Sequence, residues 1–309
     1  MTDRGRVPLS PINGAVLRMA KEPRTSVPTG LAPIVVAVGG SDVSGSATSW
    51  GAAEAERRQL PLRLVHVVGW PYVGVGDAPA LEPRSAAIEM SGVVLAEAAA
   101  HARHGAQGMQ PVTETLWGSV GPMLLDETAR AHTLVLGRGS RSGYGNALTG
   151  SVVPALAAHA ACTVVAVPET PGGRWRMGRP RVVVAFDGSP SSHAALEYAK
   201  DVATTRDADI EVVRVEPSGG DDSGGRFSSV TAGGDIDALT DVEFRTIRAQ
   251  PVEALVAAAA AADLLVVGCR GRALEDPMGS VGRGVIYHAR CPVAIVPPPI
   301  RARTVTLGE

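Results

Sequence analysis

Aromatic residues, lysine and an excess of positive charge are all scarce in this 309-residue chain. Aromatic side chains make up 4% of the sequence, so a packed core has to be built from Val, Leu, Ile and Ala. All but Lys21 and Lys200 of the 29 basic residues are Arg, and the formal net charge is −2 at pH 7. A protein held on nucleic acid by phosphate contacts, or on an anionic membrane surface, needs a basic excess. We therefore expect neither nucleic acid nor a membrane as a partner.

Cysteine is also rare, and long apolar runs are missing. The odd number of cysteines (Cys162, Cys269 and Cys291) and the lack of a CxxC pair argue against a disulfide framework or a zinc site. No apolar run reaches the roughly 20 residues of a membrane helix, and segment 1–33 has no signal-peptide pattern. We expect a protein of the reducing cytoplasm.

Four sequence blocks occur twice in the same order, which indicates an internal duplication. The paired blocks are 34–41 with 182–189, 133–137 with 263–268, 150–153 with 279–282, and 159–168 with 288–297. The offset falls from 148 positions at the first block to 131 and then 129. The second copy has therefore lost 17 residues early in the repeat and two more later.

Each copy alternates apolar, strand-like runs with helical segments. In the first copy we expect strands at 34–38, 62–68, 112–116, 134–136 and 163–167, and helices at 49–58, 85–104, 121–130 and 151–159. Apolar runs without alternation indicate strands buried on both faces, and strands separated by helices form βαβ units. The expected fold class is α/β, with two doubly wound parallel-sheet domains of Rossmann-like or flavodoxin-like type in tandem.

The second copy differs where the first has its long helix. Segment 217–234 is rich in Gly, Ser and Asp and predicts a loop, and only 235–241 has the pattern of a short helical turn. The expected domains are 32–170 and 181–298, joined by a linker at 171–180 and flanked by a flexible N-terminal extension (1–31) and a tail (299–309).

The first candidate site feature is the turn after the first strand of each copy. Open parallel sheets bind ligands at the carboxyl ends of their strands. Asp187 in the second copy can accept hydrogen bonds from a ribose or base there, or it can serve the turn itself. The first copy has Gly39 at this position, and Asp42 nearby is predicted to cap a helix.

The second feature is a glycine turn after the fourth strand, and the third is a Gly-Ser pair that opens the next helix. Glycine lets the backbone approach a ligand closely, and free N–H groups at a helix N-terminus bind anions. The Ser hydroxyls of the pairs add donors, but plain helix capping explains them equally well. The residues are Gly137, Ser140, Gly150 and Ser151 in the first copy, and Gly268, Gly271, Gly279 and Ser280 in the second.

Arginines and a cysteine flank the glycine turns. Each arginine can either pair with phosphate or be solvated; they are Arg138, Arg141, Arg270 and Arg272. Cys269, next to Arg270, is a candidate redox sensor. Cys162 and Cys291 directly precede the last strand of each copy, so we expect them to be packed in the core.

A hydrophobic strand with Asp-Gly-Ser, the pattern Gly-x-x-Gly-x9-Gly-Ser/Thr and a later His-x-x-Cys-Pro-Val together resemble the universal stress protein family in its tandem form. The resemblance covers roughly residues 32–298. It implies that the eight glycine-turn and Gly-Ser residues above bind phosphate, that Asp187 lies on the adenine side, and that Val67 and Val215 offer main-chain contacts. The first copy departs from the pattern at Gly39 and Ser140, and the spacer 272–278 of the second copy has seven residues instead of nine.

The resemblance also implies a function. Many members of the family bind ATP, so we expect a stress-response protein that binds an adenine nucleotide as a regulatory ligand without efficient turnover, with accompanying Mg²⁺ left open. No residue is assigned to catalysis or to a resident metal, because Walker-type, His-Glu-x-x-His and Gly-x-Ser-x-Gly motifs are missing. Two alternatives stay open: a ligand-free scaffold acting through protein contacts, and a slow ATPase in which Asp187 assists a metal.

The family resemblance further implies that the last strands of the two copies, 163–167 and 292–296, pair within the chain. Such pairing makes an internal pseudo-dimer and covers two apolar strand edges that would otherwise invite aggregation. A homodimer of the whole chain and an unidentified protein partner are both compatible with this arrangement.

Overall fold

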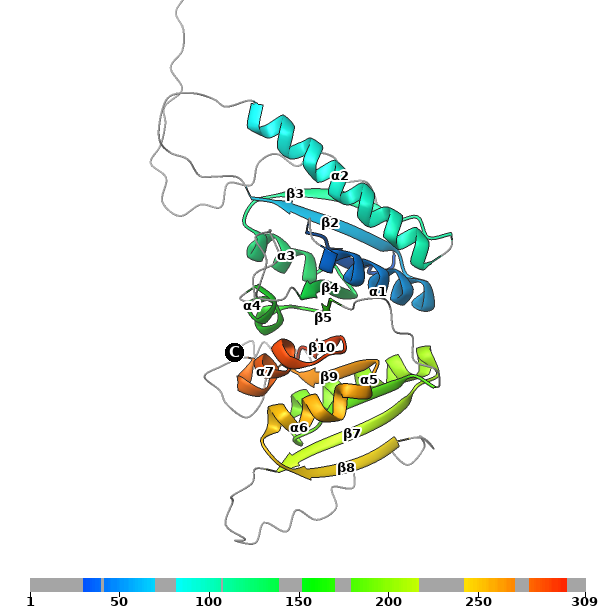
Figure 1. The fold of residues 1–309 in the computed structure, drawn as a ribbon, viewed down its shortest axis with the longest axis vertical. Helices are drawn as coiled ribbons and strands as arrows, with labels where there is room; N and C mark the ends of the chain where they lie inside the picture. The colour runs from blue at the N-terminus through cyan, green and yellow to red at the C-terminus, as the bar shows by residue number, and fades with distance from the viewer. Residues whose placement is uncertain are drawn as a thin grey trace, which may run out of the picture.

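The structure, a computed structural model, describes residues 30–39, 42–69, 82–106, 108–138, 152–169, 179–216, 242–269 and 278–298. Within these ranges the two copies of the repeat form two matching halves that share one continuous sheet (Figure 1). The predicted loop 217–234, the predicted short turn 235–241 and most of the linker lie outside the described residues.

The first half follows the predicted alternation closely. Its elements are β1 (Ile34–Ala37), α1 (Asp42–Arg58), β2 (Leu62–Val68), α2 (Glu82–Gly105), β3 (Val112–Trp117), α3 (Val120–Thr128), β4 (Thr133–Arg138), α4 (Val152–His159) and β5 (Thr163–Pro168). Each strand lies within two residues of its predicted bounds. Helix α1, however, begins seven residues before its predicted start at Ser49. The Ser- and Gly-containing segment 42–48 has low helix propensity, but Ala47 and Thr48 are fully buried in the fold, and this packing extends the helix.

The second half repeats this order without a described counterpart of α2. Its elements are β6 (Arg181–Ala185), α5 (Pro190–Arg206), β7 (Asp209–Glu216), β8 (Val242–Arg248), α6 (Pro251–Ala258), the 3-10 helix η1 (Ala259–Ala261), β9 (Leu264–Gly268), α7 (Gly279–His288) and β10 (Val293–Val296). Phe244 on the edge strand β8 is largely exposed.

The strand order confirms two doubly wound α/β domains. The sheet runs β3-β2-β1-β4-β5-β10-β9-β6-β7-β8, which is the order 3-2-1-4-5 in each half. All pairs are parallel except β5 with β10, which run antiparallel with Val165 opposite Ala294. The predicted pairing of the two last strands is therefore confirmed, and it joins the halves at the centre of a ten-stranded sheet.

Helices cover both faces of the sheet, and their small side chains pack closely on its apolar strands. Helices α1, α2 and α5 contribute to the core on one face, and α3, α4, α6 and α7 contribute to the core on the other. Strand residues such as Val36, Val184 and Leu265 are completely buried. Because both faces are covered, a ligand reaches the sheet at the rim where the parallel strands end.

A buried ion cluster also joins the two halves, between the equivalent helices α1 and α5. The Glu54 carboxylate is fully buried and accepts bonds from Arg58 (2.5 Å) on its own helix and from Arg206 (2.6 Å) on α5. Arg58 also pairs with Asp201 at 2.6 Å, and the Arg206 guanidinium lies 5.0 Å from the centre of the Trp50 ring. Burial alone would raise the pKa of Glu54, but the guanidiniums of Arg206 and Arg58 outweigh it and hold that pKa below its ordinary value.

Candidate functional site

The candidate site lies at the carboxyl ends of the strands, where the strand order reverses. The reversal falls between β1 and β4 in the first half and between β6 and β9 in the second. Because adjacent connections leave on opposite faces at this point, a crevice opens there in doubly wound sheets. Asp187 follows β6 and Gly268 ends β9, so the two residues flank the crevice of the second half.

Asp187 holds the turn that leads into α5. Its carboxylate accepts a hydrogen bond from the backbone N–H of Ser189 at 2.9 Å, across Gly188 with φ of +77°. Ser189 in turn caps α5 by accepting a bond from the N–H of Ser192 at 3.2 Å. Asp187 therefore serves the turn, as one of its two predicted roles requires, while its side chain stays exposed to solvent at the rim.

In the matching turn of the first half, neighbouring side chains contact main-chain groups. The Ser44 hydroxyl donates to the Gly39 carbonyl at 2.5 Å and accepts from the Gly39 N–H at 3.0 Å. His66 places Nδ1 2.7 Å from the Val38 carbonyl oxygen, at the end of β1. Asp42 is the first residue of α1. At the position of Asp187 the first half has Gly39, and the described main-chain groups of its turn bond to Ser44 and His66.

Gly268 is required by a close contact with α5. A Cβ at this position would lie 2.6 Å from both the backbone carbon and the carbonyl oxygen of Ser191, closer than real Cβ atoms come. The glycine at the end of β9 therefore lets the first turn of α5 approach the strand, which narrows this part of the crevice. Sequence reasoning assigned Gly268 to the ligand and missed this packing partner, because Ser191 carries no motif.

Other predicted residues fall at the expected positions or outside the described part. Val67 and Val215 are partly buried near the ends of β2 and β7. Gly137 is the penultimate residue of β4. Ser140, Gly150, Ser151, Gly271, Arg141, Arg270 and Arg272 lie outside the described residues.

The N-terminus of α7 lies at the carboxyl-end rim of the second half, after β9. Gly279 is the first residue of the helix and has φ of +70°, a conformation that glycine adopts without strain. Ser280 is the second helical residue and is exposed, while Met278 is the N-cap and makes no side-chain capping bond. The interpretation of Ser280 as the N-cap is therefore wrong. The first-turn N–H groups of a helix have no acceptor within the helix and carry its positive dipole end, so this end suits an anion.

Arg138 was predicted either to pair with phosphate or to be solvated, but in the structure it contacts the second half of the chain. Its guanidinium crosses from the end of β4 to the second half and donates to the carbonyl oxygens of Ile286 and Ala289 at the C-terminus of α7. Burial lowers the pKa of Arg138. This arginine stabilises the negative end of a helix dipole.

Cys269 makes the corresponding contact in the opposite direction. Cys269 follows Gly268 as Arg138 follows Gly137, and its thiol donates to the Ala157 carbonyl oxygen of α4 at 3.2 Å. The side chain is 2% exposed, so the accessible setting that a redox sensor needs is not there. Cys162 and Cys291 are buried as predicted.

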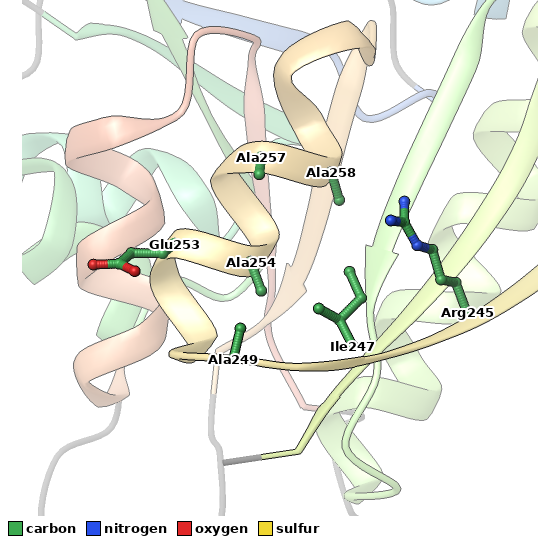
Figure 2. Close-up of a pocket in the computed structure, with 7 residues that line it drawn as sticks. All are labelled: Arg245, Ile247, Ala249, Glu253, Ala254, Ala257 and Ala258. Carbon is green, nitrogen blue, oxygen red and sulfur yellow. The ribbon is translucent and has the colours of Figure 1, made fainter. Parts of the chain in front are cut away.

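A separate hollow of about 360 Å³ lies between β8 and α6 and contains none of the predicted site residues. Figure 2 shows small alanine side chains of α6 facing Ile247 and Arg245 of β8. In the first half the equivalent helix carries Glu127, which pairs with Arg63 in the buried interior, whereas α6 has Ala258 at the matching position. One lining residue of the hollow is therefore small where the first half has a larger, charged side chain.

Two classes of site find no support in the described ranges. No group of three or more His, Cys, Asp or Glu side chains among the described residues could hold a metal ion. No helix in these ranges combines the length and the apolar character needed to cross a membrane.

Comparison with known proteins gives one consistent result. The sequence model described as "Universal stress protein family" matches twice, at residues 31–168 and 178–297. The chain is 30% identical over 301 residues to universal stress protein Rv1996 of Mycobacterium tuberculosis, covering 85% of this chain and 94% of the relative. It is 31% identical over 290 residues to a universal stress protein of Mycolicibacterium smegmatis, covering 86% and 97%.

Solved structures show the same fold. A universal stress protein from Archaeoglobus fulgidus superposes with a TM-score of 0.63 at 17% identity, covering 85% of this chain and 96% of that one.

Proposed function

The chain belongs to the universal stress protein family, and we propose that it is a stress-response protein whose second half binds an adenine nucleotide, with ATP the expected ligand. Both halves match the family, so membership alone does not choose between their rims. The choice rests on the turn after the first strand. The second half has the exposed carboxylate of Asp187 there, whereas the first half has Gly39, whose N–H and carbonyl both bond to the Ser44 hydroxyl.

The observation that carries the proposal is the N-terminus of α7, with its exposed Ser280, on the same rim as Asp187. Main-chain N–H groups of the first turn, with the Ser280 hydroxyl, suit the phosphates. The Asp187 carboxylate suits the hydroxyls of a ribose or the donors of a base. The main chain at Val215, near the end of β7, then lies on the adenine side. Gly271 completes the predicted set from outside the described residues.

The ligand is proposed to act as a regulator and not as a substrate. Among the predicted rim residues of the second half, Asp187 is the one residue with a carboxylate, and this carboxylate already accepts a hydrogen bond from the N–H of Ser189. General base catalysis or metal-assisted hydrolysis needs a positioned base or a set of carboxylate ligands. Mg²⁺ bound with the nucleotide would take most of its ligands from phosphate oxygens and water, as it commonly does.

Equilibrium dialysis of the full chain with labelled ATP tests the proposal. A Gly279→Asp variant places a carboxylate where phosphate is expected, so we expect at least about tenfold weaker binding. Gly279→Asn is the matched control, since it has the same shape without the charge, and both Asn and Asp tolerate positive φ better than other side chains. No retention of ATP by the unchanged chain up to millimolar concentration would defeat the proposal and leave a ligand-free scaffold.

A further inference from the structure

The N-terminus of α7 belongs to the proposed nucleotide site, but its C-terminus is held by the other half of the chain. Helix α7 has 10 residues, so its two ends are parts of one short rigid element. At its C-terminus the N–H of Ala289 donates to the Val285 carbonyl oxygen. The Arg138 guanidinium donates to the carbonyl oxygens of Ile286 and Ala289. The side chain that fixes the helix end therefore comes from the first half.

The place of Arg138 in the first half adds a second connection. Arg138 is the last residue of β4 and directly follows Gly137, the first residue of the glycine turn of that half. Its backbone is held in the sheet, where it lies opposite Pro168 of β5. The base of the side chain that holds α7 is therefore fixed in the sheet of the first half.

The same contact occurs in reverse. Cys269 follows Gly268 of the second half and donates to the Ala157 carbonyl of α4, the position that corresponds to Ile286 of α7. The arrangement occurs twice, once with a guanidinium donor and once with a thiol donor. It therefore follows from the way in which the two halves are joined. The guanidinium is the stronger link, because it makes two charge-assisted bonds, whereas the thiol shares one weakly donated proton between the Ala157 and Ala158 carbonyls at 3.2 and 3.9 Å.

Resting on the proposed function, we propose that Arg138 is a positioning residue for the nucleotide site of the second half. It holds α7 so that the Gly279 and Ser280 end meets the phosphates.

Binding of labelled ATP to the full chain tests the proposal. We expect Arg138→Gln to weaken the binding about fivefold and Arg138→Lys, which keeps a charged donor, to restore part of it. Asp201→Asn is the matched control. It removes the charge from another polar contact between the halves, with Arg58 at 2.6 Å, without touching α7, and should leave the affinity unchanged.

Amide hydrogen exchange without nucleotide provides the second measurement. Arg138→Gln should speed exchange along α7, including the Gly279–Val281 end, more than Asp201→Asn does. Unchanged exchange and unchanged affinity in Arg138→Gln would overturn the proposal, as would equal effects of Asp201→Asn. If Arg138→Gln does not fold, Arg138→Lys carries both comparisons. If the unchanged chain binds no ATP, the proposed function fails instead, and exchange alone decides whether Arg138 holds α7.

Discussion

Gly268 and Ser191 lie so close together that the strand β9 and the first turn of α5 leave no space for a side chain between them. A Cβ at Gly268 would be 2.6 Å from the Ser191 carbonyl oxygen and 2.8 Å from its Cβ. The atoms it would meet are mainly backbone, which cannot rotate away. The crevice of the second half therefore depends on a glycine for its shape, whatever ligand it holds.

Replacing this glycine should be costly. We expect Gly268→Ala to lower the free energy of unfolding by about 1–3 kcal/mol, because the added methyl group overpacks a rigid contact. Urea denaturation followed by circular dichroism measures the change. In Gly121→Ala the new Cβ would meet no heavy atom within 4 Å, and we expect a neutral or slightly stabilising effect of less than about 1 kcal/mol. Equal stability of Gly268→Ala and Gly121→Ala would contradict the close contact between Gly268 and Ser191.

The buried Glu54 should give the fold an acid-sensitive element. Glu54→Gln leaves the buried Arg206 without its carboxylate partner and leaves Arg58 with Asp201 alone, so we expect a loss of about 3 kcal/mol at pH 7. Glu197→Gln is the control, because Glu197 pairs with Lys200 on an exposed surface and should change stability by less than about 0.5 kcal/mol.

The pH dependence of the Glu54 contribution follows from the direction of its pKa shift. The pKa of Glu54 is held below its ordinary value, so its contribution is present above the unfolded pKa of about 4.3 and is lost as the pH falls through the folded value. Denaturation at several pH values between about 3 and 7 should therefore show a smaller acid loss in Glu54→Gln than in the unchanged chain. Parallel curves would show that Glu54 does not titrate differently on folding.

The three thiols should be unreactive toward thiol reagents in the folded protein. Burial raises the pKa of Cys162 to about 12 and that of Cys291 to about 11, and Cys269 is buried against α4. We expect no fast reaction with Ellman's reagent at pH 8, and three reactive thiols after denaturation. A fast thiol in the native protein that disappears in Cys269→Ser would restore the redox-sensor interpretation.

Asp187 offers a way to separate its turn role from its ligand role. Asp187→Asn keeps an oxygen that can accept the Ser189 N–H, so stability should stay within about 0.5 kcal/mol, while binding of ATP weakens severalfold through loss of the charge. Asp187→Ala removes both and should also cost about 1 kcal/mol of stability. Paired measurements of thermal unfolding and dialysis distinguish the cases. Unchanged ATP affinity in Asp187→Asn would show that Asp187 acts only in stabilising the turn.

The strands followed from the sequence because they depend on local patterns. Continuous apolar, β-branched runs such as Val35 and Val36 in β1 favour strands covered on both faces. The repeated block that contains Thr163–Pro168 placed the last strand of each half at the same point of the fold, and the family resemblance supplied the pairing of these two strands, which covers their apolar edges.

The contacts at the rim did not follow, because their partners are backbone atoms or residues without a motif. The acceptors of Arg138 are main-chain carbonyls, which every residue carries. Whether Ser280 caps α7 or lies within it depends on the path of the preceding segment, so the Gly-Ser pair alone left that position open. The early start of α1 depends on burial of Ala47, which acts through tertiary packing.

The antiparallel pairing of β5 with β10 has a consequence for any attempt to study one half alone. Residues 163–168 are all buried in the full chain, so a fragment that ends near the linker would present this strand with an open, apolar hydrogen-bonding edge. Two such fragments could meet edge to edge about a twofold axis, with each β5 taking the place of β10 for the other. A severed half is therefore expected to self-associate, and its properties would be those of the assembled pair and not of an isolated domain.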